Sequence, residues 1–544
     1  MATALFFSFL GSLVICMALI PPLMASAGRL HFLDIPGGRK AHSGSVAKVG
    51  GIALATGTFI GVLMWAPKND DIVLASLAGG LTILLFGIWD DRVGLAYGMK
   101  FAGQALAAFI VLAVGGIQID SLPMVPDEWM APWISLPLTF LALIAVTNAV
   151  NLADGLDGLA GGLSLISFAG MAYLAFQTDD AVLMLMVVSV LGGLLGFLRY
   201  NTYPARIFMG DAGSQFLGFY LGVTGLVLTD QAHGPYSPMV ALFVWGLPLL
   251  DTLGVMIQRW REGRSPFVGD RNHLHHKLLG MGRSHREAVM VIYALQIAMV
   301  ALAYALRWQP DWVLILVYAA VAGGVLTLFL RPAVREKKPN DSSDRLPDAG
   351  TSGWPALHPR LAKLPIQILA MAVPGFLILS VALPRRIPSD AGLAAAGLLI
   401  VLAVGLRLYP WIAPFLVRAG LYVGSTFILY FGEVGSLSAT YSWFRPVNLF
   451  LVCVAVLVVL VMRLSAVRSF ETTPLDSLMI LLAMVLPFLP AVEVGDINLS
   501  LLTAKLIVLF FSFELLLQAY GDRLGLAGLL ASWLLGGLAV RAWW

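Results

Sequence analysis

The sequence predicts an all-α, polytopic bundle of transmembrane helices. Of its 544 residues, 59% are hydrophobic and only 12% are charged, whereas soluble domains carry about 25% charged residues. The hydrophobic residues recur along the whole chain in blocks near the ~20 residues that a helix needs to cross a bilayer. Strand-like alternation is absent, and only helices and closed barrels satisfy their backbone groups in lipid. These observations exclude a water-soluble protein and favour helices throughout.

About eleven spans are predicted in the first 331 residues. The first block, Ala2 to Ser26, lacks the basic start and the cleavage site of a secretory signal, so we expect it to be retained as a span. Polar clusters separate the later blocks, and boundaries of this kind are good to a few residues. The predicted spans are 3–26, 50–67, 72–89, 100–118, 133–149, 160–177, 181–198, 213–229, 239–257, 288–306 and 312–330.

A polar stretch separates these spans from a second hydrophobic region. Residues 332–362 are rich in Pro, Ser, Asp and Lys, which is typical of a linker, and we expect this one to be cytoplasmic. Beyond it, residues 363–544 are predicted to form an additional hydrophobic transmembrane region of unknown role. Its spans, about seven, are predicted at 364–382, 391–408, 411–430, 447–463, 474–493, 500–519 and 524–543.

Basic residues gather in one set of loops. Arg259, Arg261 and Arg264 belong to this set, whereas the opposite loops carry acids such as Asp179 and Asp180. Cytoplasmic loops carry an excess of Lys and Arg, so the basic face is predicted to be cytoplasmic and the N-terminus external. The net charge of +3 gives no reason to expect nucleic acid as a partner.

Two adjacent carboxylates, Asp90 and Asp91, end the predicted 72–89 span on the basic face. A helix C-terminus carries partial negative charge, which disfavours each carboxylate by roughly 0.3–1 kcal/mol, and their adjacency adds repulsion. A bound cation would relieve both effects; a solvated turn is the alternative. Lys100 and Gln104 follow at the start of the next span, where we interpret them as no more than a snorkelling pair.

The segment NAVNLADGLDG places polar groups at every third residue: Asn148, Asn151, Asp154 and Asp157. Glycines between them predict that the helix breaks near Asp154, so that the two amides face the same site as the two acids. Amide and carboxylate oxygens on a loosened backbone suit Mg²⁺ or a sugar nucleotide. A purely structural turn is the alternative.

Asp211 lies between Gly210 and a run of small residues at the start of the 213–229 span. A helix N-terminus favours anions, so this carboxylate could simply cap the helix. Alternatively, it holds a metal ion whose other ligands are phosphate oxygens.

The segment DRNHLHH brings Arg271, His273, His275 and His276 together on the longest cytoplasmic loop. The histidine spacing does not match the i, i+4 spacing of helical zinc sites. Imidazole and guanidinium groups that converge on phosphates explain the composition better than zinc or a generic basic loop.

The loop after the first span carries Arg39, Lys40 and His42. Its cations are predicted either to meet phosphate or merely to enforce topology.

These clusters together resemble the polyprenyl-phosphate N-acetylhexosamine-1-phosphate transferase superfamily, of the glycosyltransferase family 4 type. The resemblance runs from about Leu33 to Leu279 and comprises five motifs in order. It is closest to the branch that uses UDP-GlcNAc and undecaprenyl phosphate. The motifs are D-x-P-x-x-R-K-x-H from Asp34, the Asp90–Asp91 pair, N-x-x-N-x-x-D-G-x-D-G from Asn148, F-x-G-D-x-G-S around Asp211, and H-x-H-H from His273.

The resemblance implies a function and a set of site residues. It implies transfer of a sugar-1-phosphate, GlcNAc-1-phosphate above all, from a UDP-sugar to polyprenyl phosphate with release of UMP. Mg²⁺, with Mn²⁺ as a substitute, is implied as the cofactor. The implied catalytic residues are Asp90, Asp91, His273, His275 and His276, the substrate-binding residues are Arg39, Lys40, Asn148, Asp154, Asp157 and Arg271, and the metal ligands are Asn151 and Asp211.

The resemblance also sets the expected location and partners. Residues 1–331 are predicted to be the catalytic domain, in a bacterial inner membrane with the active site on the cytoplasmic face. Membrane lipid is an expected partner, and a homodimer or envelope glycan-assembly proteins are partners left open. The rival function is a secondary transporter, in which broken helices form a site at the bilayer midplane between repeats. No repeat is found here, and the polar clusters gather at one interface.

Overall fold

The chain divides into two compact units, Met1–Asp344 and Arg345–Trp544. The computed structural model describes residues 2–34, 45–230, 235–265, 273–330, 359–382, 384, 387–408, 413–433, 446–464, 493–494, 497–520 and 524–543. The boundary between the units falls inside the predicted linker at 332–362, which itself lies almost entirely outside the described residues.

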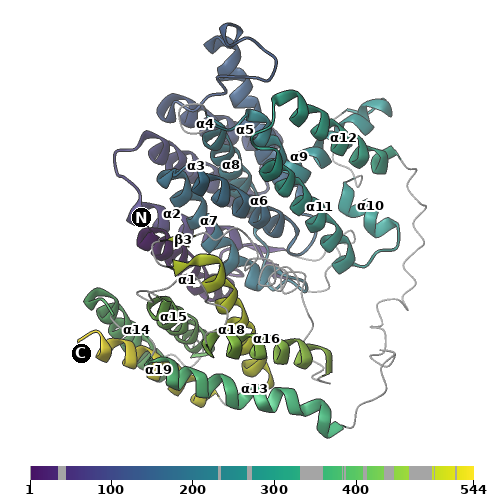
Figure 1. Ribbon diagram of the computed structural model, residues 1–544. Coiled ribbons are helices and arrows are strands. Elements are labelled where there is room, and N and C mark those ends of the chain that lie inside the picture. The colour runs from purple at the N-terminus through teal and green to yellow at the C-terminus, as the bar shows by residue number, and fades with distance from the viewer. Residues whose placement is uncertain are drawn as a thin grey trace. The chain divides into compact units, whose positions relative to one another are not determined.

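The first unit is built of long apolar helices that lie side by side (Figure 1). Each of the predicted spans corresponds to one of them, and the predicted all-α membrane bundle is confirmed. The prediction missed a short helix, α10 (Leu274–Gly280). The long helices are α1 (Ala2–Ser26), α2 (Gly50–Trp65), α3 (Asp71–Val93), α4 (Tyr97–Gly115), α5 (Pro132–Ala153), α6 (Leu159–Gln177), α7 (Ala181–Asn201), α8 (Gly210–Thr229), α9 (Pro238–Arg261), α11 (His285–Leu306) and α12 (Asp311–Leu330).

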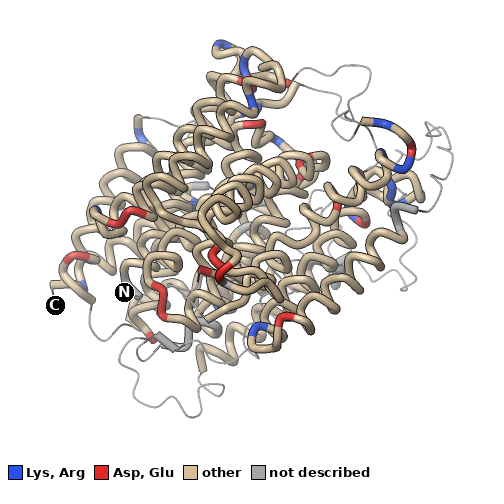
Figure 2. Tube along the Cα trace, turned by 90° about the horizontal axis from the view of Figure 1, so that it is seen from above, with Lys and Arg blue, Asp and Glu red and all other residues tan. Residues whose placement is uncertain are grey.

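Charged residues are sparse along these helices, as the mostly tan tube of Figure 2 shows. Ten helices in the described part of the chain are long and apolar enough to cross a membrane. The protein is therefore a multi-pass membrane protein.

Helix α8 is the centre of the first unit. Its apolar stretch is completely buried, because α2, α3, α5, α6 and α9 all pack around it. Two glycines permit the closest approaches to its first turn. A Cβ atom at Gly51 of α2 would collide with the backbone of Gly213, and one at Gly87 of α3 would collide with that of Ala212. The N-terminus of α8 is thereby held against α2 and α3.

The second unit is also helical. Six of its seven predicted spans correspond to described helices, whereas the segment predicted at 474–493 lies almost entirely outside the described residues. These helices are α13 (Pro359–Ser380), α14 (Ser389–Leu408), α15 (Ala413–Glu433), α16 (Pro446–Leu464), α18 (Leu499–Ala519) and α19 (Leu524–Arg541).

Within the part of the chain that the structure describes, the strands are two short antiparallel pairs that the sequence did not predict. In the first unit, β1 (Leu33–Asp34) pairs with β2 (Val46–Ala47). In the second, β3 (Glu493–Val494) pairs with β4 (Ile497–Asn498).

Candidate active site

Asp90 is fixed at the end of α3 by the way that helix terminates. Gly94 adopts a left-handed conformation with φ of 71°, and its N–H donates to the Asp90 carbonyl at 2.8 Å. The chain then turns so that the Leu95 N–H donates to Asp90 Oδ1 at 2.7 Å. The Asp90 side chain is almost completely buried, with its second oxygen directed toward α4.

The Asp91 carboxylate is hydrogen-bonded to the N-terminus of α8. Its Oδ1 and Oδ2 accept the N–H groups of Asp211 and Ala212, each at 2.9 Å. Gly210 has a φ of 69°, and a Cβ atom there would collide with the Asp91 carboxylate. A carboxylate is stabilised at the positive end of a helix. The carboxylate that would be disfavoured at the end of its own helix is thus stabilised at the start of another.

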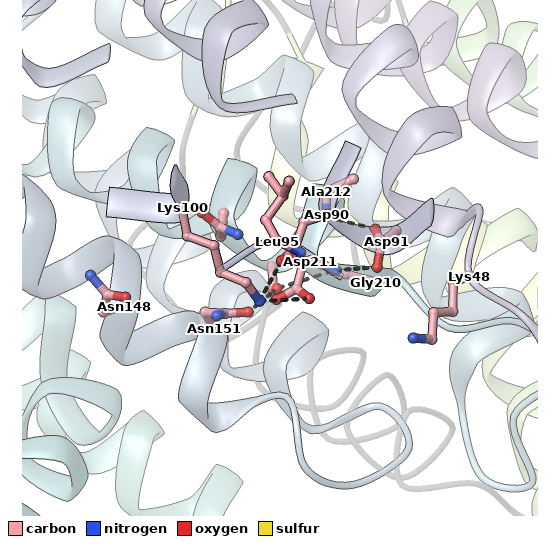
Figure 3. A network of polar contacts seen from close by, with 12 residues as sticks. Lys48, Asp90, Asp91, Leu95, Lys100, Asn148, Asn151, Gly210, Asp211 and Ala212 are labelled. Atoms are coloured by element: carbon pink, nitrogen blue, oxygen red, sulfur yellow. Dashed lines mark hydrogen bonds and ion pairs between the residues drawn. The ribbon is translucent and has the colours of Figure 1, made fainter. Parts of the chain in front are cut away.

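Lys100 lies between two carboxylates (Figure 3). Its ammonium group pairs with Asp90 Oδ2 and lies 3.6 Å from Asp211 Oδ2. The interpretation of Lys100 and Gln104 as a snorkelling pair is therefore wrong, because both side chains turn inward to polar partners. Their sequence position near a span end could not distinguish the two orientations.

The two amides of α5 have different partners. Asn151 Oδ1 accepts a hydrogen bond from Ser214 Oγ of α8 at 2.6 Å, which places it beside the Asp211 turn. Asn148 donates to Gln104 Oε1 at 2.8 Å, and Gln104 in turn donates to Gln215 Oε1 at 3.0 Å. Asn151 therefore lies next to Lys100 and Asp211, whereas Asn148 lies further along α5 (Figure 3).

Helix α5 ends at Ala153 and α6 begins at Leu159, so the predicted helix break near Asp154 is confirmed. Asp157 Oδ2 accepts the Ala205 N–H at 2.9 Å. Gly158 has a φ of 78°, donates to Asn201 Oδ1 at 3.1 Å and accepts from the Tyr293 hydroxyl at 2.6 Å. These contacts hold the turn between α5 and α6 rigidly.

Asp154 is the most electrostatically strained residue of that turn. Its pKa is raised to about 7, first by burial and then by the negative charges of Asp211, Asp91 and Asp157. The same interactions show that Asp154 shares the electrostatic environment of the α3 and α8 carboxylates. A positively charged ligand or a nearby metal ion would stabilise its ionised form.

The histidine tract packs against the same turn. His273 and His275 are buried, and a Cβ atom at Gly155 would collide with His275 Nε2. Burial, followed by the neighbouring imidazoles of His276 and His273, lowers the pKa of His275 to about 3. His275 is thus neutral at pH 7, and its ring centroid lies 4.2 Å from that of His276.

The structure therefore gathers most of the predicted site residues at one end of the first unit. Asp91 contacts the backbone of Asp211, Asp90 and Asp211 share Lys100, and Asn151 bonds to Ser214 in the same turn of α8. The turn from Asp154 to Asp157 lies between this group and the histidine tract. Their chemical roles stay predictions. Arg39, Lys40 and Arg271 lie outside the described residues. Sequence reasoning misjudged Lys100 and missed Ser214 and Asp251, because Asp211, Asn151 and His273, which they contact, lie on other helices or turns.

The oxygen atoms of Asp90, Asp211 and Asn151 are the candidate ligands for a metal ion. Among the described residues, no group of three or more His, Cys, Asp or Glu side chains is arranged as a metal site by itself. Asp90 and Asp211 nevertheless direct carboxylate oxygens toward a single cation, the Lys100 ammonium, and Asn151 adds an amide oxygen nearby. Mg²⁺ prefers such oxygen ligands, takes only one or two carboxylates and completes its shell with water and phosphate. The residues present fit Mg²⁺.

Comparison with known proteins agrees with this geometry. Residues 73–229 match the profile of glycosyl transferase family 4. The chain is 32% identical over 307 residues to the probable undecaprenyl-phosphate N-acetylglucosaminyl 1-phosphate transferase of Bacillus subtilis (strain 168), which spans 56% of this chain and 86% of that protein. It is 31% identical over 305 residues to the undecaprenyl-phosphate alpha-N-acetylglucosaminyl 1-phosphate transferase of Escherichia coli (strain K12), covering 54% of this chain and 82% of that protein.

A third relative has the same name and a similar extent. The protein from Yersinia pestis is 31% identical over 328 residues, which cover 58% of this chain and 88% of that relative. The predicted resemblance is confirmed, since most of each relative is matched, together with the profile across α3 to α8. The chain belongs to glycosyl transferase family 4.

Proposed function

We propose that this protein transfers GlcNAc-1-phosphate from UDP-GlcNAc to undecaprenyl phosphate and releases UMP. One observation carries the proposal: Asp90 and Asp211, from two helices far apart in sequence, share a single cation, with Asp91 bound to the start of α8 beside them and the turn from Asp154 to Asp157 nearby. Relatives 31–32% identical to the chain are named as undecaprenyl-phosphate N-acetylglucosaminyl 1-phosphate transferases, which supports the proposal.

The reaction joins two polyanions, so electrostatic repulsion is the main obstacle. Asp90, Asp211 and Asn151 would hold Mg²⁺, with Mn²⁺ as a substitute. When bound, the ion would neutralise the diphosphate and stabilise the departing UMP. Lys100, which pairs with the same two carboxylates, would contribute a second positive charge beside the ion. Arg39, Lys40, Arg271 and the histidine tract would supply further donors to phosphate oxygens.

The acceptor needs no strong base. A phosphate monoester has its second pKa near 6, so the lipid phosphate is mostly dianionic at neutral pH. Both oxygens of Asp91 already accept backbone N–H groups, and Asp90 is engaged by Leu95 and Lys100. These partners support positioning of the acceptor and the metal by the Asp90–Asp91 pair over proton abstraction.

The site would lie at the cytoplasmic face of a bacterial inner membrane, which the basic loops of the sequence support. Residues 1–331 would form the catalytic domain and 363–544 an additional membrane region, and UDP-GlcNAc would enter from the cytoplasm. A secondary transporter is not favoured, because the polar side chains gather at helix ends and the relatives are named as transferases.

The direct test uses the purified full-length protein with undecaprenyl phosphate and a panel of radiolabelled UDP-sugars. We expect label to enter the lipid only from UDP-GlcNAc, with one UMP released per transfer. Chelation by EDTA should stop the reaction and added Mg²⁺ should restore it. Transfer from a different UDP-sugar would show that the proposed donor is wrong, and the absence of transfer from any of them would overturn the proposed reaction.

A further inference from the structure

Helix α9 changes direction in its middle, and the change is built into the surrounding helices. Gly246 has φ of 48° and ψ of −127°, which breaks the helical hydrogen bonding. The Gln296 side chain of α11 replaces the missing partners: its Oε1 accepts the Leu247 N–H at 2.8 Å, and its Nε2 donates to the Val244 carbonyl at 3.1 Å. Ser167 of α6 donates to the same carbonyl at 2.9 Å. The second half of α9 is therefore held at a defined angle.

The residue presented by that second half is Asp251, and both of its oxygens are used. Oδ2 lies 2.8 Å from His273 Nδ1, and Oδ1 accepts the Leu274 N–H at 2.7 Å. Asp251 is 7% exposed and His273 is 5% exposed. A buried carboxylate with a hydrogen bond on each oxygen fixes both the His273 ring and the backbone next to it.

The chemistry of the Asp251 carboxylate fixes which atom is the donor in its hydrogen bond with His273. Asp251 and His275 line a small cavity whose other walls are apolar, among them Leu163, Leu247 and Ile292. An ionised carboxylate only accepts hydrogen bonds, so Nδ1 of His273 must be the donor. The remaining ring nitrogen, Nε2, then carries the lone pair of the neutral ring: it can accept a proton, and it can donate to a phosphate oxygen only when it is protonated.

We propose that Asp251 is the positioning residue of the histidine tract. It sets the tautomer and orientation of His273 and anchors the first residue of α10. Since His275 packs against Gly155, the same anchor also places α10 against the turn that carries Asp154 and Asp157. This inference rests on the proposed transferase function, and it assigns Asp251 to the part of the site that contacts the sugar diphosphate.

The test compares Asp251→Asn with His273→Gln and with the double variant. Asn has the shape of Asp, but its amide group donates where the carboxylate accepted, so His273 should adopt the other tautomer. We expect Asp251→Asn to lower kcat about 10²-fold or more, with KM for UDP-GlcNAc changed less than about threefold. Combined with His273→Gln, it should cause no further loss, because both substitutions disable the same unit.

Ser167→Ala is the matched control, because it removes two hydrogen bonds at the α9 kink, one to Val244 and one from Gln296, while the Gln296 contacts to Leu247 and Val244 remain and His273 is not touched. It should change kcat less than about threefold. If the Asp251→Asn and His273→Gln losses multiply, or if Ser167→Ala matches Asp251→Asn, Asp251 acts only on stability and the inference is overturned.

A second readout needs no turnover. Ring ¹⁵N chemical shifts of the eight histidines, with His273 assigned from its loss in His273→Gln, report the tautomer directly. We expect protonated Nδ1 at His273 in the wild type and a different state in Asp251→Asn. An unchanged ring overturns the inference even if the wild type uses another substrate, whereas an inactive wild type with the expected shifts overturns only the proposed function.

Discussion

The two units of the molecule place charge inside an apolar bundle in different ways. In the described part of the second unit, Lys505 of α18 and Glu433 of α15 form an ion pair of one positive and one negative group. At the candidate-site end of the first unit, by contrast, two carboxylates, those of Asp90 and Asp211, share one ammonium group, that of Lys100, and the Asp91 carboxylate lies beside them at the start of α8. A balanced pair stabilises itself, whereas an excess of carboxylates favours the binding of a further cation. The imbalance, and not burial of charge as such, distinguishes the candidate site.

The largest effect is expected when this imbalance is reduced. Asp211→Asn should lower UMP release by about 10³-fold or more, because it removes a carboxylate proposed to hold Mg²⁺. Asp230→Asn is the matched control: Asp230 caps the opposite end of the same helix and should alter the rate less than about twofold. Equal losses in the two variants would show that α8 tolerates no change and that Asp211 has no special role.

A smaller effect is expected on acid stability through His275. Its folded pKa of about 3 lies below the ordinary value of 6.5, so between these pH values the unfolded chain binds a proton that the folded protein does not. Stability should therefore fall as the pH decreases, by about 2 kcal/mol between pH 6.5 and 5. His275→Gln should remove this part of the loss.

The measurement is the thermal unfolding midpoint in detergent from pH 7.5 to 5. His31→Asn is the control, since His31 is exposed and has a φ of 61° that Asn tolerates. Parallel curves for wild type and His275→Gln would show that His275 is not buried in its neutral form.

Asp154 should show the opposite pH dependence, with a smaller size. Its raised folded pKa, about 7, means that the folded protein holds a proton that the unfolded chain lacks between about pH 4 and 7. Its ionisation therefore destabilises the protein increasingly up to pH 7 and fully above it. The side chain is only half-buried, so water screens part of the effect, and we expect about 1–2 kcal/mol.

Asp154→Asn should accordingly raise the unfolding midpoint at pH 8 without Mg²⁺ and UDP-GlcNAc, and the gain should vanish near pH 4. Activity should fall, because a predicted nucleotide-binding carboxylate is lost. A gain that is independent of pH would show that packing, and not charge, is responsible.

The smallest effect on activity is expected in the second unit. The double variant Glu433→Gln, Lys505→Met replaces a buried pair by neutral groups, which is often neutral for stability. UMP release should stay within about twofold of the wild type, whereas Lys505→Met alone leaves a buried carboxylate and should lower the unfolding midpoint. A loss of turnover in the stable double variant would show that the second unit takes part in catalysis.

Much of the helical architecture was predictable from local hydropathy. The span predicted at 160–177 is α6 (Leu159–Gln177), and the one at 213–229 lacks only the first turn of α8, because Gly210 and Asp211 there are not apolar. The break at Asp154 was predictable because glycines interrupt the apolar run. Helix α10 was missed, since its seven residues, LHHKLLG, are too few and too polar for a hydropathy signal.

The sequence by itself determined the order of the long helices that the structure describes and the motifs on which the family resemblance rests, because apolar runs and motif spacing are properties of neighbouring residues. Only the tertiary structure decided which of those polar groups meet. Asp91 binds the α8 N-terminus 120 residues away, Lys100 lies between Asp90 and Asp211, and Asp251 holds His273. Such contacts depend on how neighbouring helices pack and rotate against one another, and that packing is set by the whole bundle.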